Sequence, residues 1–173
     1  IAIDAIRQTQ LDYFGKSILI LGMGTMGVRC LKKLHAQGHP DITICNRTHS
    51  TATQLAERHS IETRDFNTIL KELHTFDIII SAITLKTHFI QKEHLSTQKN
   101  QLLIDLGLPR NINPELDTHS SVKLINVDGL KQIAEKNIVK RKKEVEHAQA
   151  IIDEDIHNFN QWLSYKQKHV TKH

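Results

Sequence analysis

A glycine-rich turn that joins a strand pattern to a helix pattern constrains this chain more than any other feature. Ser17–Leu21 is a run of small and apolar residues, typical of a strand buried on both faces. Gly22, Gly24 and Gly27 follow at the spacing G-x-G-x-x-G, and helical periodicity resumes over 28–34. In dinucleotide-binding turns the first glycine permits the sharp turn, the second admits the pyrophosphate, and the third lets the helix pack on the strand. The pattern therefore predicts a dinucleotide site; a glycine-rich turn that binds nothing is the simpler alternative.

The start of the helix after this turn should supply the anion-binding groups. A helix N-terminus offers N–H groups without intrahelical partners and a partial positive charge, and both suit phosphate oxygens. We therefore expect a cofactor to lie against the whole turn, namely Gly22, Met23, Gly24, Thr25, Met26 and Gly27.

The residues after the second predicted strand, 41–45, indicate which dinucleotide binds. NAD-binding folds place an acidic residue about 20 positions after the glycines, where it holds the ribose 2′-hydroxyl. This chain has Asn46, Arg47 and Thr48 there instead. A guanidinium and two polar side chains suit a 2′-phosphate, and no carboxylate in this stretch would repel it. We therefore predict NADPH rather than NADH; a solvated turn with Thr48 capping a helix over 49–58 is the alternative.

Strand and helix patterns alternate over the first 128 residues. Further strands are predicted over 61–64, 76–81, 101–106 and 122–127, and a brief helix capped by Asp65 would bury Phe66, Ile69, Leu70 and Leu73. This alternation is typical of an α/β fold with a Rossmann-like, doubly wound and mostly parallel sheet. Ligands of such sheets lie beyond the carboxyl ends of the strands. Further cofactor contacts are therefore expected from Ser81, Ala82, Ile83 and Gly107.

Helical segments flank the sheet on both sides in the sequence. Residues 1–14 are expected to form a linker helix that ends at Gly15, with apolar positions at Ile3, Ile6, Leu11 and Phe14. From Leu130 to His173 no glycine or proline interrupts a helical pattern, and a helix of about 35 residues would be about 50 Å long. Its apolar stripe cannot all fold back on the sheet, so it predicts a partner helix and a homodimer. The stripe comprises Val145, Ala148, Ile152, Ile156, Phe159 and Leu163.

These patterns divide the chain into three segments. We predict a linker helix over 1–14, an NADPH-binding domain over 15–128 and a long dimerisation-type helix over 129–173. Because the chain begins at Ile1 rather than Met, we expect it to be part of a longer protein.

Charge and cysteine content narrow the class of protein. The net charge of +4 permits an acidic partner such as RNA without requiring one. The run Lys140–Lys143 is a candidate for RNA phosphate contact, and a solvated helix face is the simpler interpretation. No apolar run has the length of a membrane span, and the start shows no signal-peptide pattern. Two cysteines give neither a disulfide framework nor a metal spacing, so we expect a cytoplasmic protein without a metal site.

Catalytic residues are not evident in this sequence. The twelve histidines are scattered, and there is no nucleophile elbow or P-loop. Cys30 is expected in the core. Cys45 is expected at the adenosine side of the pocket, away from the redox chemistry. We therefore predict no catalytic residue within the chain.

Several motifs in order resemble those of glutamyl-tRNA reductases. They are Gly22–Gly27, Asn46-Arg47-Thr48, the block Asp105–Ile112 (Asp-Leu-Gly-Leu-Pro-Arg-Asn-Ile), Asn126–Leu130, and a long charged helix with Ile151-Ile152 and Phe159–Trp162. The resemblance covers essentially the whole chain, from the linker through the NADPH domain into the dimerisation helix. Two positions depart from the family pattern. Ser81–Thr84 replaces a Ser/Thr-rich turn, which bears on the nicotinamide contacts, and Gly129 replaces an acid.

The resemblance implies a two-part enzyme in tetrapyrrole (porphyrin) synthesis. A separate N-terminal domain would bind glutamyl-tRNA and carry a cysteine that takes the glutamyl group as a thioester. NADPH held by the present domain would then deliver hydride to give glutamate-1-semialdehyde. That catalytic domain would precede Ile1, so this chain alone is expected to be inactive.

Two other interpretations stay open. Shikimate-dehydrogenase-like NADP oxidoreductases also place Asn-Arg-Thr after the second strand, but the block around Pro109 and Arg110 and the long helix speak against them. The other interpretation is a dimeric dinucleotide-sensing module without catalysis, which is consistent with the lack of catalytic residues.

Overall fold

The structure is a computed structural model that describes residues 1–9 and 12–170, with side chains described through residue 164. The predicted apolar position Leu11 and the last predicted helical residues, 171–173, lie outside this range. The chain forms two compact units, Ile1–Lys131 and Gln132–His173.

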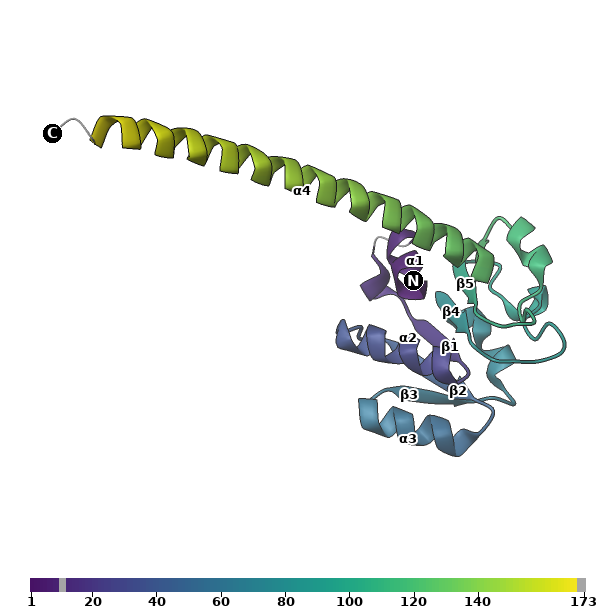
Figure 1. Cartoon of the computed structure of the whole chain (residues 1–173). Coiled ribbons are helices and arrows are strands. Elements are labelled where there is room, and N and C mark those ends of the chain that lie inside the picture. The colour runs from purple at the N-terminus through teal and green to yellow at the C-terminus, as the bar shows by residue number, and fades with distance from the viewer. Residues whose placement is uncertain (10–11, 171–173) are drawn as a thin grey trace. The chain divides into compact units, whose positions relative to one another are not determined.

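A six-stranded parallel sheet forms the centre of the first unit (Figure 1). The strand order is β3-β2-β1-β4-β5-β6, so the order reverses between β1 and β4. This confirms the predicted Rossmann-like sheet, with strand ends within two residues of those expected. The strands are β1 (Ile18–Leu21), β2 (Ile42–Asn46), β3 (Glu62–Asp65), β4 (Ile78–Ser81), β5 (Gln101–Asp105) and β6 (Val122–Asn126).

The central strands are apolar because both of their faces are covered. Every residue of β1 and β4 is buried, whereas the edge strand β3 has no buried residue. Two α-helices follow β1 and β2, α2 (Thr25–Ala36) and α3 (His49–His59), and each packs on neighbouring strands of the sheet (Figure 1). A separate hydrophobic cluster combines Leu19 and Leu21 with residues from the connections after β3 and β4, such as Leu73 and Ile90.

The connection between β3 and β4 differs from the predicted brief helix. It contains two 3₁₀ turns, η2 (Ile69–Lys71) and η3 (Leu73–Thr75). Ile69 and Leu73 are buried as expected. A spacing of three to four residues fits short 3₁₀ turns as well as one α-helical turn, so the apolar pattern could not separate the two.

The predicted single helix over 1–14 is divided. Helix α1 (Ala2–Thr9) buries Ile3 and Ile6, and a 3₁₀ turn, η1 (Tyr13–Gly15), follows. The Tyr13 hydroxyl donates a hydrogen bond to Gln37 Oε1 at 3.0 Å, and the ring packs against His39. Phe14, one of the predicted apolar positions, is 43% exposed. Two further 3₁₀ turns, η4 (Lys92–His94) and η5 (Pro114–Thr118), lie before and after β5.

Helix α4 (Val127–Val170) has 44 residues and is about 66 Å long at 1.5 Å per residue. It begins two residues earlier than predicted. The reason is a cap, because Asn126 Oδ1 accepts a hydrogen bond from the Gly129 N–H at 2.9 Å. The apolar side chains predicted to need a partner are exposed, including Val145, Ile152 and Phe159. Among the helices of the described residues, none is long and apolar enough to cross a membrane.

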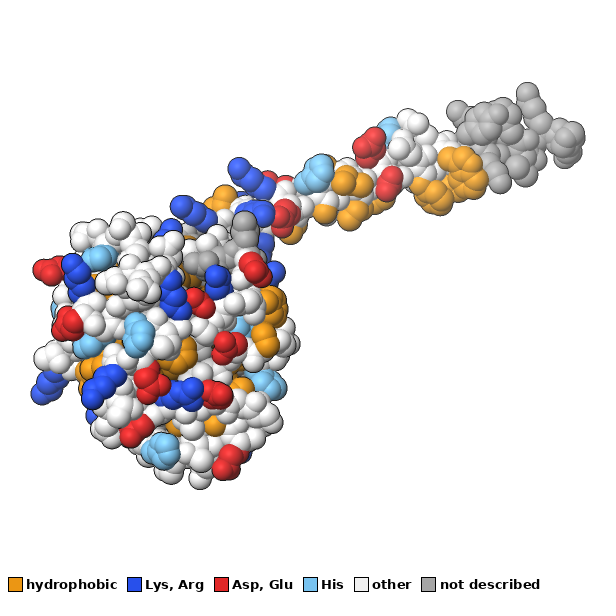
Figure 2. All heavy atoms as spheres, turned by 180° about the vertical axis from the view of Figure 1, so that it is seen from behind, with side chains coloured by type: hydrophobic (Ala, Val, Ile, Leu, Met, Phe, Trp, Pro, Cys, Tyr) orange, Lys and Arg blue, Asp and Glu red, His pale blue; other side chains and the backbone are white. Residues whose placement is uncertain are grey.

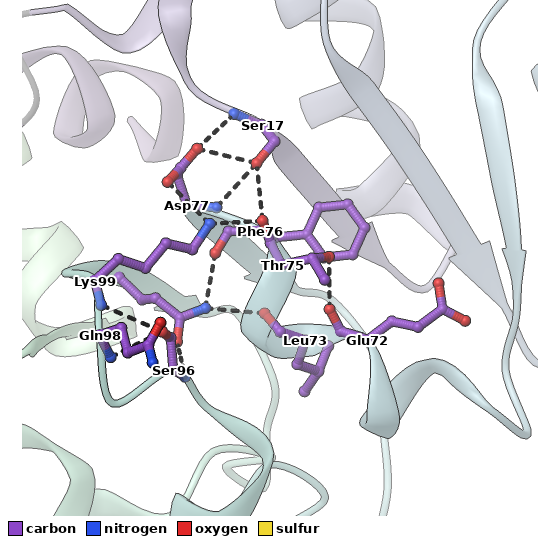
Figure 3. A network of polar contacts seen from close by, with 10 residues as sticks. Ser17, Glu72, Leu73, Thr75, Phe76, Asp77, Ser96, Gln98 and Lys99 are labelled. Carbon is purple, nitrogen blue, oxygen red and sulfur yellow. Dashed lines mark hydrogen bonds and ion pairs between the residues drawn. The ribbon is translucent and has the colours of Figure 1, made fainter.

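A closed polar network ties the amino ends of the central strands together (Figure 3). Asp77 Oδ2 accepts hydrogen bonds from both the backbone N–H and the hydroxyl of Ser17, each at 3.0 Å. Lys99 Nζ reaches Asp77 Oδ1 at 3.1 Å and the Thr75 carbonyl. Burial raises the pKa of Asp77, but the bonds from Ser17 and Lys99 outweigh it, so the pKa is lowered from the ordinary value.

Candidate functional site

The predicted cofactor segments meet at the carboxyl ends of β1, β2 and β4. Leu21, the last residue of β1, is in register with Cys45 of β2 and with Ser81 of β4. The Gly22 N–H donates to the Cys45 carbonyl and the Ala82 N–H to the Leu21 carbonyl, both at 2.7 Å. The glycine turn therefore lies between the segments that start at Asn46 and Ser81, where the strand order reverses. This is the edge at which open α/β sheets bind ligands.

The three glycines of the turn have three separate geometric reasons. Gly22 has a φ of +92°, and a Cβ there would lie 2.7 Å from the Ala82 carbonyl oxygen. The turn leaves no room for a side chain at Gly27, because a Cβ would lie 1.8 Å from the Gly22 carbonyl oxygen. Gly24 is different, because no heavy atom lies within 4 Å of the place a Cβ would take. Two glycines thus fold the turn, and the middle one keeps open space above it.

The N-terminus of α2 faces this open space without a side-chain cap. Gly24 is the N-cap residue, and its carbonyl accepts from the Val28 N–H at 3.0 Å. The N–H groups of Thr25, Met26 and Gly27 have no acceptor among the described residues. Thr25 and Met26 are exposed. Three backbone donors and a positive helix end are therefore available to an anion such as a pyrophosphate.

Asn46 connects the glycine turn to the residues that follow β2. Its Oδ1 accepts from the Met23 N–H, and its Nδ2 donates to the Thr48 carbonyl, both at 3.1 Å. The amide was predicted to contact the cofactor, but both of its ends are already bound to the protein. Asn46 therefore holds the two halves of the predicted site in register.

Arg47 is the cation of the site. It is exposed and forms no hydrogen bond or ion pair within the described part of the chain. Thr48 is the N-cap of α3, but its side chain makes no capping bond, so the hydroxyl stays available. The carboxylate nearest in register is Asp65, opposite Asn46, and its Oδ1 accepts from Asn67 N–H at 2.9 Å. The sequence pattern did not reveal that neighbour.

The residues after β4 lie deeper than the glycine turn. Ser81 is wholly buried, and its hydroxyl has no hydrogen-bond partner among the described residues. Ile83 is 9% exposed and packs beneath Gly22, where its Cγ2 would meet a Cβ at 2.8 Å. Ala82 is half-buried. These three predicted contacts form the floor of the site rather than its exposed surface.

Asp105 and Asn111 organise the loop after β5, and neither was predicted as a site residue. Asp105 is 1% exposed and accepts from the N–H groups of Gly107, Asn111 and Ile112 at 2.9–3.0 Å. Asn111 is wholly buried; it donates to the Ile83 carbonyl at 2.7 Å and accepts from the Leu85 N–H at 3.0 Å.

This arrangement locks the loops after β4 and β5 to each other. It also explains Gly107, because a Cβ there would lie 1.7 Å from the Asn111 amide nitrogen. Gly107 is buried in this junction, so its predicted place near a cofactor rests on the strand order alone. The only sequence signal was the Asp-Leu-Gly and Asn-Ile ends of the block 105–112.

Neither cysteine is placed for chemistry. Cys45 is wholly buried in the hydrophobic cluster, so the expectation that it lines the pocket is wrong. Burial, followed by the nearby carboxylates of Asp65 and Glu72, raises the pKa of the Cys45 thiol to about 12. Burial also raises the pKa of Cys30. A thiol with a raised pKa is a poor nucleophile at neutral pH. Among the described residues no cluster of three or more His, Cys, Asp or Glu could hold a metal ion.

Comparisons with known proteins agree with this geometry. Residues 5–133 match the family model described as shikimate / quinate 5-dehydrogenase. A glutamyl-tRNA reductase of Chlorobium limicola is 37% identical over 156 residues, which are 86% of this chain and 37% of that protein. The structure of a glutamyl-tRNA reductase from Methanopyrus kandleri aligns with a TM-score of 0.77 at 24% identity, over 94% of this chain and 42% of that one.

A further solved structure that resembles this chain contains only a nucleotide-binding domain. It is the nucleotide binding domain of glutamyl-tRNA reductase from Thermoplasma volcanium, with a TM-score of 0.61 at 23% identity. The alignment covers 82% of this chain and 97% of that structure. The chain thus spans little more than a third of the length of the curated relative.

Proposed function

The chain belongs to the shikimate / quinate 5-dehydrogenase family, and we propose that it is the NADPH-binding domain of a glutamyl-tRNA reductase. A nicotinamide dinucleotide is the cofactor class that the family and the glycine turn support. The observation that carries the proposal is the open space over Gly24 beside three available N–H groups, together with the exposed and unpaired Arg47 that follows β2.

Different residues of the site would bind different groups of the cofactor. The N–H groups of Thr25, Met26 and Gly27 would bind the pyrophosphate. Arg47, together with the Thr48 hydroxyl, would bind the ribose 2′-phosphate, and Ser81–Ile83 would support the nicotinamide side from below. When bound, NADPH supplies a hydride to an activated glutamyl carbonyl. This chain orients the cofactor, and residues outside it hold the acyl group.

Cofactor titrations test the choice of NADPH. A charge-assisted hydrogen bond contributes about 1.5–3 kcal/mol, so the wild-type chain should bind NADPH about ten- to a hundredfold more tightly than NADH. Arg47→Ala should remove most of that preference while leaving the affinity for NADH nearly unchanged. Arg58→Ala, which removes an exposed arginine of α3, is the matched control. Equal affinities of the wild type for both cofactors would falsify the assignment.

Turnover assays test the division of labour. We expect the chain to bind NADPH but leave it unconsumed when glutamyl-tRNA is added, because hydride transfer needs an acyl carbon held about 3–3.5 Å from the nicotinamide. Both thiols are buried with raised pKa values and cannot hold that carbon. Oxidation of NADPH that depends on glutamyl-tRNA would place a nucleophile within these residues.

A dimer through α4 is the second part of the proposal. Val145, Ile152 and Phe159 are spaced by seven residues and are 50–67% exposed. Ile156 is 54% and Leu163 is 36% exposed. Such a stripe is typical of a helix that pairs with another copy. Ile152→Asp with Phe159→Asp should convert dimers to monomers in sedimentation. His147→Asp with Asn158→Asp adds the same charges off the stripe and should not.

The family model also names a different substrate. A shikimate-type oxidoreductase would use the same glycine turn and the same Arg47, so the cofactor titration does not separate the two enzymes. Oxidation of shikimate by NADP⁺ in the presence of this chain, or of a longer protein that contains it, would favour that alternative. The relatives that match across α4 favour the reductase.

A further inference from the structure

The charges of α4 are sorted along its length. Between residues 132 and 143 five cations stand against a single carboxylate, Glu135. These cations, here named the basic tract, are Lys136, Lys140, Arg141, Lys142 and Lys143. From 144 to 163 there is no lysine or arginine, but there is an acidic tract of Glu144, Glu146, Asp153, Glu154 and Asp155. Figure 2 shows blue side chains gathered on one stretch of the helix, with red and orange ones farther along it.

Carboxylates of the described residues neutralise little of the charge of the basic tract. All five side chains are exposed. The one ion pair of the tract within the described residues joins Lys140 to Glu144 at 3.9 Å, with both side chains more than 60% exposed. Such a solvated pair is worth little. The tract therefore keeps nearly its full positive charge toward solvent.

The geometry of the tract suits a charged backbone more than a single anion. Successive helical residues are about 100° apart, so Lys140–Lys143 surround the helix in one turn. Lys136, Lys140 and Lys143 lie on one face at i, i+4 and i+7, over about 10 Å of helix. Nucleic acids present their phosphates in closely spaced rows, and cations that contact several of them gain affinity by releasing counterions.

We propose that the basic tract is a contact surface for the phosphate backbone of RNA. The partner that fits is the tRNA of the substrate, so this inference rests on the proposed function. The lysines would act as point charges that position the RNA without reading its sequence, and Arg141 would add a forked contact. The tract belongs to the second compact unit, whereas the residues of the proposed cofactor site belong to the first.

The acidic tract argues against an anionic membrane as the partner. A helix that lies on a membrane surface keeps basic residues along its polar face and apolar residues along the other. The apolar side chains of α4 that are most suited to insertion lie around Ile152 and Ile156, and three consecutive carboxylates, Asp153, Glu154 and Asp155, lie between these two in the sequence. These carboxylates would be repelled by anionic lipids, whereas an RNA can contact the basic tract alone.

Fluorescence anisotropy with a labelled, unacylated glutamate-accepting tRNA tests the surface. The wild-type chain should bind, and the logarithm of its affinity should fall with the logarithm of salt concentration at a slope of about −4 for five phosphate contacts. A variant with Lys140→Gln, Arg141→Gln, Lys142→Gln and Lys143→Gln should bind at least tenfold more weakly. Its salt slope should be shallower by about 3, because four contacts are lost.

A charge-matched variant is the control. Lys32→Gln, Lys71→Gln, Lys92→Gln and Lys123→Gln remove four exposed lysines of the first unit and should change the affinity less than threefold. An equal loss in this control, or no binding by the wild type at 50 mM salt, would overturn the proposal. So would tighter binding to phosphatidylserine vesicles than to tRNA. A tract that instead pairs with the acidic tract of another copy would reveal itself if the variant lost self-association but kept its RNA affinity.

The same variant separates this inference from the proposed function. NADPH affinity should be identical in the wild type and the tract variant, because no residue of the proposed cofactor site belongs to the tract. If tRNA binding fails while NADPH is bound in preference to NADH, only the surface is wrong. The proposed function is wrong if tRNA binds through the tract but a longer protein that contains this chain fails to reduce glutamyl-tRNA.

Discussion

The two edges of the central sheet use polar groups in opposite ways. At the amino ends, Ser17, Asp77 and Lys99 bond to one another and to nearby backbone, so the network is closed. At the carboxyl ends of β1 and β2, the first three N–H groups of α2 and the Arg47 guanidinium have no partner within the described chain. Both edges belong to the same register of parallel strands, so the contrast lies in the loops and not in the sheet. Saturated polar groups stabilise a fold, while unsatisfied ones at the surface remain available to a ligand.

The carboxyl edge itself contains one closed region. Beyond β5, the Asp105 carboxylate accepts from the Asn111 N–H, and the Asn111 side chain donates to the Ile83 carbonyl. These polar groups are therefore bonded within the protein, like those of the amino edge. The contrast therefore separates the open glycine turn from two closed junctions. Variants in the closed junctions should therefore change the free energy of unfolding, and variants in the open turn should change the affinity for the cofactor.

Asp105→Ala should have the largest effect and extends the contrast to the carboxyl edge. It leaves the buried N–H groups of Gly107, Asn111 and Ile112 without their acceptor, so the free energy of unfolding should fall by about 3–5 kcal/mol. Urea unfolding followed by circular dichroism measures it. Asp117→Ala, an exposed aspartate, should change stability by less than about 0.5 kcal/mol. A loss below 1 kcal/mol for Asp105→Ala would mean that the junction is not closed.

Gly27→Ala and Gly24→Ala form a matched pair within the open turn. The methyl group at position 27 would overlap the Gly22 carbonyl, so the unfolding free energy should fall by about 1–3 kcal/mol. At position 24 the methyl group meets no atom, so stability should change by no more than about 0.5 kcal/mol. Gly24→Ala should nevertheless weaken NADPH binding, because the methyl group occupies the space above the turn. Equal thermal shifts for the two variants would contradict this distinction.

Asp77→Ala tests whether the amino edge serves stability alone. The loss of the bonds from Ser17 and Lys99 should lower the unfolding free energy by about 1–2 kcal/mol at pH 7, with NADPH affinity unchanged. Because folding lowers the pKa of Asp77, its contribution is complete above the ordinary value of 3.8 and is lost as the pH falls through the folded pKa. The stability gap between wild type and variant should therefore narrow below pH 4. A gap that is constant down to pH 2.5 would exclude the carboxylate as its source.

Asn46→Ala should have the smallest effect on stability and sharpens the contrast at the open edge. It removes the bonds to the Met23 N–H and the Thr48 carbonyl, so the glycine turn and Arg47 lose their common support. NADPH affinity should fall about tenfold, while the unfolding free energy falls by no more than about 1 kcal/mol. In combination with Arg47→Ala the losses should be less than additive, as measured by isothermal titration. Fully additive losses would show that Asn46 does not position Arg47.

The sequence predicted the strands and the glycine turn because their causes are local. Apolar runs placed the strands other than the polar edge strand β3 within two residues, and the spacing of Gly22, Gly24 and Gly27 encoded the turn. Bonds between distant segments left no such pattern. Asn111 joins Ile83, 28 positions away, and Ser17 joins Asp77, 60 positions away. The start of α4 was predictable in principle, because Asn126 is a good N-cap three residues before Gly129.

The strand order also determines when each strand can pair while the chain is being synthesised. Ile18 of β1 pairs with Ile42 on one side and with Ile78 on the other, sixty positions later. At about 5–20 residues per second, the ribosome takes about 3–12 s to make that second partner. During this interval one side of Ile18–Leu21 has no strand to cover it, and its four apolar residues are open to other nascent chains. Strand β1 thus remains an open edge until β4 is made, later than β2, whose second partner β3 ends at Asp65.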